Sequence, residues 1–94
     1  MSSGHGDGRI ARIEARLRAA LAPESLDVID ESAAHAGHEG AKSGGGHYAV
    51  TIVSPRFAGQ APLARHRLVY QALGELMQHD IHALKITALT PDEL

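Results

Sequence analysis

Histidine is the side chain with which this chain can do the most chemistry. Seven of its 94 residues are histidines and none is a cysteine, which excludes disulfides, zinc ribbons and thiol catalysis. Any metal chemistry must therefore use histidine, aspartate or glutamate. A neutral imidazole nitrogen is a common ligand of borderline metals, and the ring titrates near physiological pH.

His82 opens a segment, residues 82–89, whose alternating apolar residues predict a strand. Two roles remain open for it from the residues alone. It is either a partly buried histidine that caps the strand, or a metal ligand that the end of the strand holds rigidly.

His35 and His38 lie in a glycine-rich segment, residues 32–46, that contains no large apolar residue. We expect a loop there, and loops of this length are usually functional or disordered. Each histidine is either a solvated loop residue or a ligand on a segment that can close over an incoming metal. The two together fall short of a closed zinc site.

The other histidines carry weaker signals. His47 begins a predicted strand, and His79 forms an H-x-x-H spacing with His82 that arises easily by chance in so histidine-rich a chain. His66 falls within the apolar arc of a predicted helix, where we expect a hydrogen-bonded structural residue. His5 lies in the N-terminal tail.

Periodicity predicts the elements that must position these residues. Residues 1–8 are small and polar and are expected to be disordered, with Asp7 as a helix cap, and residues 9–94 form one domain. The expected elements are a helix that Ala22-Pro23 ends, strands over 26–31 and 47–53, a turn over 54–59, a helix over 62–78, the strand over 82–89 and a helix start at 90–93. This order predicts an α+β sandwich of two layers, in which helices cover one face of a three-stranded sheet.

The two long helices are predicted to be amphipathic. In the first, the arginines lie off the apolar stripe and form an exposed basic face. In the second, most of the large apolar residues share one side. The residues expected on that side are Leu63, Val69, Tyr70, Leu73 and Met77, and the arginines of the first helix are Arg9, Arg12, Arg16 and Arg18.

Four segments, in this order, resemble the BolA family: LDVIDES, HYAVTIVSPRFAG, RHRLVYQALGELM and IHALKITALTP. The resemblance covers roughly residues 9 to 91 and rests on the combination of F-x-G, R-H-R-x-V-Y and I-H-A-L. It implies a fold similar to the class II KH domain, with the order α-β-β-α-α-β. Within F-x-G we expect structural roles for Phe57 and for Gly59, which can close a short turn.

The resemblance also implies a partner and a cofactor. Members of the family form heterodimers with monothiol glutaredoxins that carry a CGFS motif, and the two proteins share either a [2Fe-2S] cluster, held together with glutathione, or only a docking surface. By this likeness His82 is an iron ligand and His35 is the second, with His38 as a substitute. Because histidines alone cannot hold such a cluster, we expect the isolated protein to be monomeric and without it.

A DNA-binding transcriptional regulator of morphology and stress genes is the alternative that the resemblance implies. Three arginines lie around the turn and the start of the second long helix: Arg56, Arg65 and Arg67. They form either a solvated face, a surface that binds the glutaredoxin, or a surface that binds phosphates. KH domains grip nucleic acid with a G-x-x-G loop between helices, but the equivalent connection here, FAGQAP, has one glycine. The G-x-x-G at residues 37–40 lies in the strand–strand loop and contains an acid, so DNA comes second.

Composition argues against other classes of protein. The chain has no Ser/His/Asp order, no paired carboxylates in a plausible cleft and no phosphate-binding loop with its lysine, so we expect no enzyme. Its net charge of −2 and its 3% of aromatic residues are unlike those of a general nucleic-acid binder. No apolar run is long enough to cross a bilayer, and the cytoplasm is the expected location.

Overall fold

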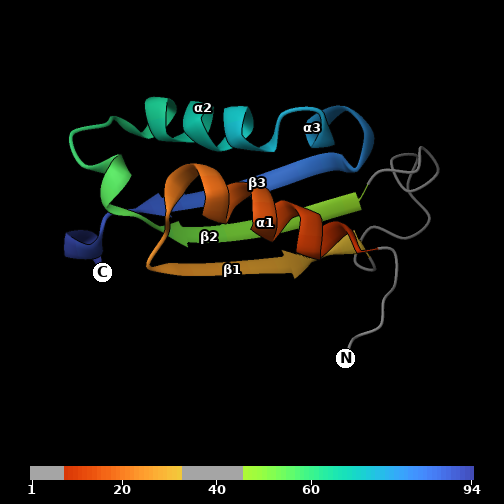
Figure 1. Cartoon of the computed structure of the whole chain (residues 1–94), viewed down its shortest axis with the longest axis horizontal. Helices are drawn as coiled ribbons and strands as arrows, with labels where there is room; N and C mark the ends of the chain where they lie inside the picture. The colour runs from red at the N-terminus through yellow and green to blue at the C-terminus, as the bar shows by residue number, and fades with distance from the viewer. Residues whose placement is uncertain (1–7, 33–45) are drawn as a thin grey trace.

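The computed structural model of the protein describes residues 8–32 and 46–94. Its helices and strands follow the predicted order, and most of their bounds agree with the expected ones to within two residues (Figure 1). The elements are α1 (Arg9–Leu21), β1 (Ser25–Asp30), β2 (Gly46–Val53), η3 (Pro55–Phe57), α2 (Pro62–Leu73), α3 (Leu76–His79), β3 (Ile81–Leu89) and η4 (Pro91–Glu93), where η denotes a 3-10 helix. No helix in these two ranges is long and apolar enough to cross a membrane. The expected cap Asp7 and the rest of the tail before Gly8 lie outside them.

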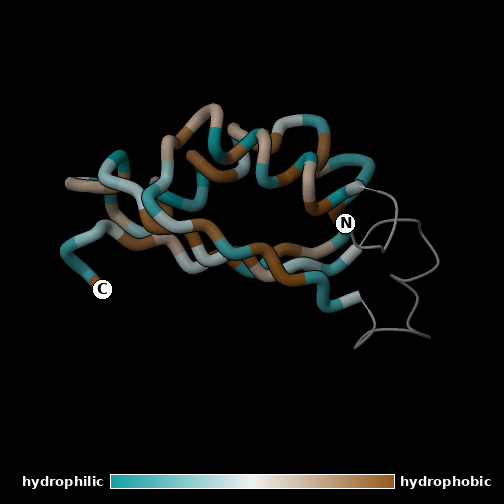
Figure 2. Tube along the Cα trace, turned by 60° about the horizontal axis from the view of Figure 1, so that its bottom comes forward, coloured by the Kyte–Doolittle hydropathy of each residue, from teal (hydrophilic) through white to brown (hydrophobic). Residues whose placement is uncertain are grey.

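The sheet has the strand order β1-β2-β3, so β2 is its central strand. β1 pairs with β2 in the antiparallel direction, which confirms that the glycine-rich segment joins two neighbouring strands. β3 pairs with β2 in the parallel direction, and the chain returns between them through α2 and α3. The three helices α1, α2 and α3 lie on one side of the sheet (Figures 1 and 2). The predicted two-layer α+β sandwich is therefore confirmed.

The core lies between these two layers and is built mainly from aliphatic residues. Strand periodicity turns alternate side chains of β2 toward the helices, and helical spacing of four residues does the same for α1. Phe57 of η3 closes one end of the core with no exposed surface. The buried residues that make the main contacts are Ile13, Leu17 and Leu21 of α1, Tyr48, Val50 and Ile52 of β2, Val69 and Leu73 of α2, Leu76 of α3 and Ile81 of β3.

A buried serine joins the end of α1 to the start of η3. The Ser54 hydroxyl is fully buried, donates a hydrogen bond of 2.6 Å to the Leu21 carbonyl and accepts one of 3.1 Å from the Arg56 backbone N–H. One side chain thus satisfies a carbonyl that the helix end leaves without an intrahelical partner and caps the next turn. The predicted cap followed by proline is confirmed.

The helix predicted over residues 62–78 is broken, and this prediction was wrong. α2 ends at Leu73, Gly74 adopts φ 54° and ψ −127°, and α3 begins at Leu76. Only glycine adopts such a backbone conformation without a steric penalty. The apolar spacing continues through Leu76 and Met77, which is why periodicity alone did not reveal the interruption.

Two residues expected on the buried side of this helix are exposed. Leu63 is 63% exposed and Tyr70 is 42% exposed, whereas Val69 and Leu73 are fully buried. Consecutive helical residues point about 100° apart. A buried arc through Val69, Ala72 and Leu73 therefore leaves Leu63 and Tyr70 on the outer flank of α2.

The basic face expected on α1 is only partly solvated. Arg18 is exposed, but Arg9, Arg12 and Arg16 contact residues 73–80, which connect α2 to β3. Because this connection is far from α1 in the sequence, a prediction based on local spacing could not identify these partners.

We predict that Gly74→Ala destabilises the protein by about 1–3 kcal/mol, the usual cost of forcing a non-glycine residue into such a conformation. The new Cβ would also lie 3.3 Å from Nη1 of Arg16. Urea denaturation followed by circular dichroism measures the loss. Gln71→Ala, an exposed change one turn earlier in α2, is the control, and an equal effect of the two variants would contradict the strain at Gly74.

Candidate functional site

The strand directions bring three chain segments together at one end of the sheet. Because β2 and β3 are parallel and β1 is antiparallel to them, the last residues of β1 and the first residues of β2 and β3 lie at the same end of the sheet. This end lies at the right of Figure 1. We call it the histidine end, made of residues 30–32, 46–47 and 80–82.

The rings of His47 and His82 are neighbours at the histidine end. Their centroids are 5.1 Å apart and their planes are inclined by 53°. Gly46 is aligned with Ile81 and His47 with Ala83, so His82 is the extra residue of a β-bulge in β3. His82 is exposed and His47 is half-buried.

His47 carried only a weak signal in the sequence, which did not place it beside His82. The signal that could have predicted the contact is that His47 and His82 each open a strand, with a helical segment between the two strands. Such a connection favours parallel pairing, and parallel pairing places the first residues of both strands at the same end. The two histidines are 35 residues apart in the sequence, so local spacing does not indicate their contact.

The backbone of His47 is held by the end of β1. The His47 carbonyl accepts a hydrogen bond of 2.7 Å from the Glu31 N–H, and its N–H donates one of 3.0 Å to the Ser32 hydroxyl. The Ser32 N–H in turn donates to a carboxylate oxygen of Asp30 at 2.8 Å. The Asp-Glu-Ser string that contributed to the family resemblance therefore anchors the first histidine of the site.

The start of β3 is fixed from the other side. The Ile81 side chain is 4% exposed and belongs to the core, while the Asp80 carbonyl accepts a hydrogen bond of 3.0 Å from the Gly46 N–H. An ion pair of 3.3 Å between Lys85 and Glu31 also links β3 to the segment after β1. His82 therefore projects from a well-anchored strand end.

The described residues supply two imidazoles here and no complete metal site. Within residues 8–32 and 46–94, no three histidine, aspartate or glutamate side chains lie close enough together to hold a metal ion. His35 and His38 lie outside the described residues. The exposed His82 imidazole can contribute a nitrogen ligand, whereas Nε2 of the half-buried His47 is covered, so further ligands must come from elsewhere.

The basic residues near the turn lie at the other end of the sheet. Arg56 belongs to η3, which follows the last residue of β2, and Arg65 contacts the Ala88 carbonyl near the last residue of β3. β3 spans nine residues. At a rise of about 3.3 Å per residue, about 26 Å separates its two ends. The structure does not bring these arginines to the histidines; Arg67 is exposed on α2.

Arg65 is engaged within the molecule. Its guanidinium forms two hydrogen bonds with the Glu93 carboxylate, of 2.6 and 3.0 Å, and donates to the carbonyls of Gln60 and Ala88. It also lies 6.0 Å from the centre of the Phe57 ring. This arginine clamp joins α2, β3 and η4, and an open pocket beside it lies between η3 and η4. Arg56 and Arg67 remain available to a partner.

The other residues expected to be structural occupy the same region. Phe57 is fully buried, and Gly59 has a φ of 77°, which suits the tight turn before α2. His66 is half-buried on α2. The hydrogen bond expected for His66 is not seen with any residue that the structure describes.

The arginine clamp changes the acidity of Glu93. The hydrogen bonds from Arg65, followed in size by the one from the Thr90 N–H, lower the pKa of Glu93 from 4.5 to about 2. Since the folded-state pKa is lowered, this pair stabilises the fold fully above pH 4.5, and the stabilisation is lost as the pH falls toward 2.

We predict that Glu93→Gln lowers Tm at pH 6, and that the difference from the parent protein narrows steadily between pH 4.5 and pH 2. Thermal unfolding followed by circular dichroism at several pH values measures this. Asp92→Asn, which removes the neighbouring carboxylate outside the pair, is the control. A Tm difference for Glu93→Gln that stays constant from pH 6 to pH 3 would argue against a stabilising clamp.

The arrangement of layers and strands defines a class of domain. The structure superposes on the BolA domain of SufE1 from Arabidopsis thaliana with a TM-score of 0.82 and 38% identity, covering 99% of this chain and all of that one. It also matches the solution structure of BolA1 from Mus musculus, with a TM-score of 0.79 and 43% identity over 99% of this chain and 73% of that one. The fold is that of a BolA domain.

Sequence comparison agrees with the structural one. A family model described as BolA-like protein matches residues 17–93. The chain is 47% identical to BolA-like protein 1 of Mus musculus over 86% of its own length and 57% of that protein, and 43% identical to the DNA-binding transcriptional regulator BolA of Escherichia coli over 87% and 75%. The chain belongs to the BolA-like family, and it spans less than two thirds of the length of the mouse protein.

Proposed function

We propose that this protein is an adaptor that pairs with a monothiol glutaredoxin and contributes imidazole ligands to a [2Fe-2S] cluster in iron-sulfur trafficking or in iron and redox regulation. The observation that carries the proposal is the exposed His82 beside His47 at the anchored histidine end. Membership in the BolA-like family supports the proposal, because members of this family pair with monothiol glutaredoxins.

The donor set at the histidine end fits a shared cluster better than a cluster held by this chain alone. The chain has no cysteine, so every thiolate must come from the glutaredoxin and glutathione. A shared [2Fe-2S] cluster would supply one-electron chemistry and transferable iron. His82 supplies a neutral nitrogen donor from a fixed strand end, and its exposure lets a second protein approach.

The second donor has three candidates. His35, with His38 as its substitute, follows from the family resemblance. His47 follows from the structure, because its ring contacts that of His82. His47 is held through its backbone by two hydrogen bonds and is half-buried, and its Nε2 atom is covered, which limits its use as a ligand. We favour His35 as the second ligand, with His47 as the neighbour that orients the His82 ring.

We predict that His82→Ala abolishes or strongly alters the visible circular dichroism of the cluster in the heterocomplex, because one iron loses its nitrogen ligand. The protein is mixed with a CGFS glutaredoxin and glutathione and reconstituted with iron and sulfide. His79→Ala removes an exposed imidazole three residues earlier and is the matched control. An unchanged spectrum for His82→Ala would show that the assignment of this ligand is wrong.

Variants of the remaining histidines identify the second ligand in the same experiment. We expect His35→Ala to alter the spectrum, His38→Ala to leave it intact, and the double variant to resemble or exceed His35→Ala. His47→Ala should shift the bands less than His35→Ala. If His47→Ala removes the signal while His35→Ala does not, the second ligand lies on β2.

DNA binding is the second candidate, and the names of relatives favour it. The relatives from Escherichia coli and Vibrio cholerae are described as DNA-binding transcriptional regulators. Arg56 and Arg67, both exposed, are available for phosphate contacts. Titration against a promoter duplex at near-physiological salt should then show sequence preference. Binding that ignores sequence and disappears with a modest rise in salt would exclude a regulator role for the isolated protein.

A further inference from the structure

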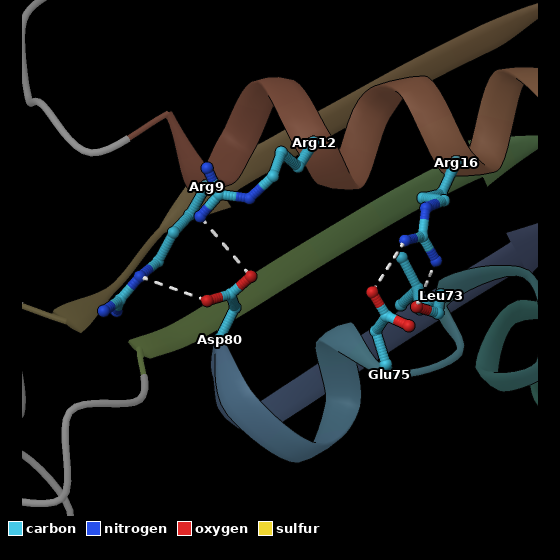
Figure 3. A network of polar contacts seen from close by, with 6 residues as sticks. All are labelled: Arg9, Arg12, Arg16, Leu73, Glu75 and Asp80. Carbon is cyan, nitrogen blue, oxygen red and sulfur yellow. Dashed lines mark hydrogen bonds and ion pairs between the residues drawn. The ribbon is translucent and has the colours of Figure 1, made fainter.

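One face of α1 reaches across to the connection that leads into β3. Arg9, Arg12 and Arg16 are spaced by three and four residues, so their side chains leave the helix on the same side. Figure 3 shows all three pointing toward residues 73–80. Arg16 donates to the Leu73 carbonyl at 3.1 Å and pairs with Glu75 at 3.4 Å.

The other two arginines converge on one carboxylate. Arg12 Nη2 lies 3.4 Å from one oxygen of Asp80, and Arg9 Nε lies 3.9 Å from the other (Figure 3). The Asp80 side chain is 20% exposed, so this carboxylate is largely covered. Two guanidinium groups on a largely covered carboxylate restrict its position more than a single exposed pair would.

The backbone of Asp80 is bound as well. Its N–H donates to the Leu76 carbonyl at 2.9 Å, and its carbonyl accepts from the Gly46 N–H at 3.0 Å. Asp80 therefore connects three elements, α1 through its carboxylate, α3 through its N–H and β2 through its carbonyl. It stands two residues before His82.

His82 depends on such flanking contacts because it occupies the bulge. A bulged residue is left out of the regular strand pairing, and its direction follows from how the chain is fixed on either side. On the N-terminal side, the fixed points are Asp80 and the buried side chain of Ile81.

We propose that Asp80, held by Arg9 and Arg12, is a positioning residue that sets the direction of His82 and keeps its ring against His47. Only the consequence of this positioning, the correct presentation of the His82 imidazole to a cluster shared with a partner, rests on the proposed function. The positioning itself is a property of the isolated protein. Partly exposed ion pairs add little to global stability, but this one acts directly on the residue that precedes the anchored Ile81 and the bulge.

The test uses nuclear magnetic resonance of the isolated full chain carrying Asp80→Asn. We expect the proton–proton contact between the His47 and His82 rings to weaken or vanish, and the Gly46 amide to exchange with solvent about tenfold faster or more, because local opening becomes easier. The midpoint of global unfolding should stay close to that of the parent protein. Unchanged ring signals and unchanged exchange at Gly46 would overturn the proposal.

Two further variants separate positioning from general damage to the network. Glu75→Gln removes an arginine–carboxylate pair of the same length from the same face of α1, but Glu75 pairs with Arg16 and lies six residues before the start of β3. It should leave the His47 and His82 signals unchanged. Arg12→Gln should reproduce part of the Asp80→Asn effect. Arg12→Lys keeps the positive charge and should restore the ring contact and the slow Gly46 exchange of the parent protein. Equal effects of Glu75→Gln and Asp80→Asn would contradict a specific role.

The heterocomplex then tests the functional consequence. If Asp80→Asn changes the ring signals and also shifts the visible circular dichroism of the reconstituted cluster, positioning matters for ligation. If Asp80→Asn changes the ring signals but leaves a spectrum that His82→Ala does alter, the proposed consequence is wrong. If His82→Ala itself leaves the spectrum unchanged, the proposed function fails, and the ring signals alone still decide whether Asp80 positions His82.

Discussion

The parallel pairing of β2 with β3 is the constraint on which the rest of this structure depends. Parallel neighbours cannot be joined by a tight turn, so the chain must return to the start of β2 before it can form β3. α2 and α3 make that return and, with α1, cover one face of the sheet. The same pairing brings His82 to His47, because the first residues of parallel strands lie side by side. Core formation and assembly of the histidine end are thus consequences of one arrangement.

The two ends of the sheet are held by different kinds of contact. At the end where β2 and β3 finish, the arginine clamp, buried Phe57 and the Ser54 hydroxyl tie η3, α1, α2 and η4 to the sheet. At the histidine end, the buried Ile81 is joined by hydrogen bonds of the backbone, one of them to the Ser32 hydroxyl, and by partly exposed ion pairs. A well-packed end and a more accessible one would suit the proposed adaptor role, which needs ligands that a partner can reach and that are still held in place.

Within the described residues the histidine end offers two imidazoles and no third ligand. Under the proposed function, the sulfur ligands of a [2Fe-2S] cluster would have to come from another molecule, because this chain has no cysteine. Affinity for the partner and occupancy by the cluster would then depend on each other. If Asp80 positions His82 as we propose, the arginines of α1 that hold Asp80 would also affect cluster binding.

The sequence by itself determined the layers, nearly all of the elements and His82 as the leading candidate, because periodicity, turn residues and the I-H-A-L motif are local signals. It did not predict the break at Gly74, since apolar spacing runs on through it. Nor did it predict the contact of His47 with His82, the engagement of Arg65 with Glu93 or the grip of Arg9 and Arg12 on Asp80. Those were decided by the tertiary structure alone, because each joins residues 28 or more positions apart, which meet only after strand direction and helix packing are set.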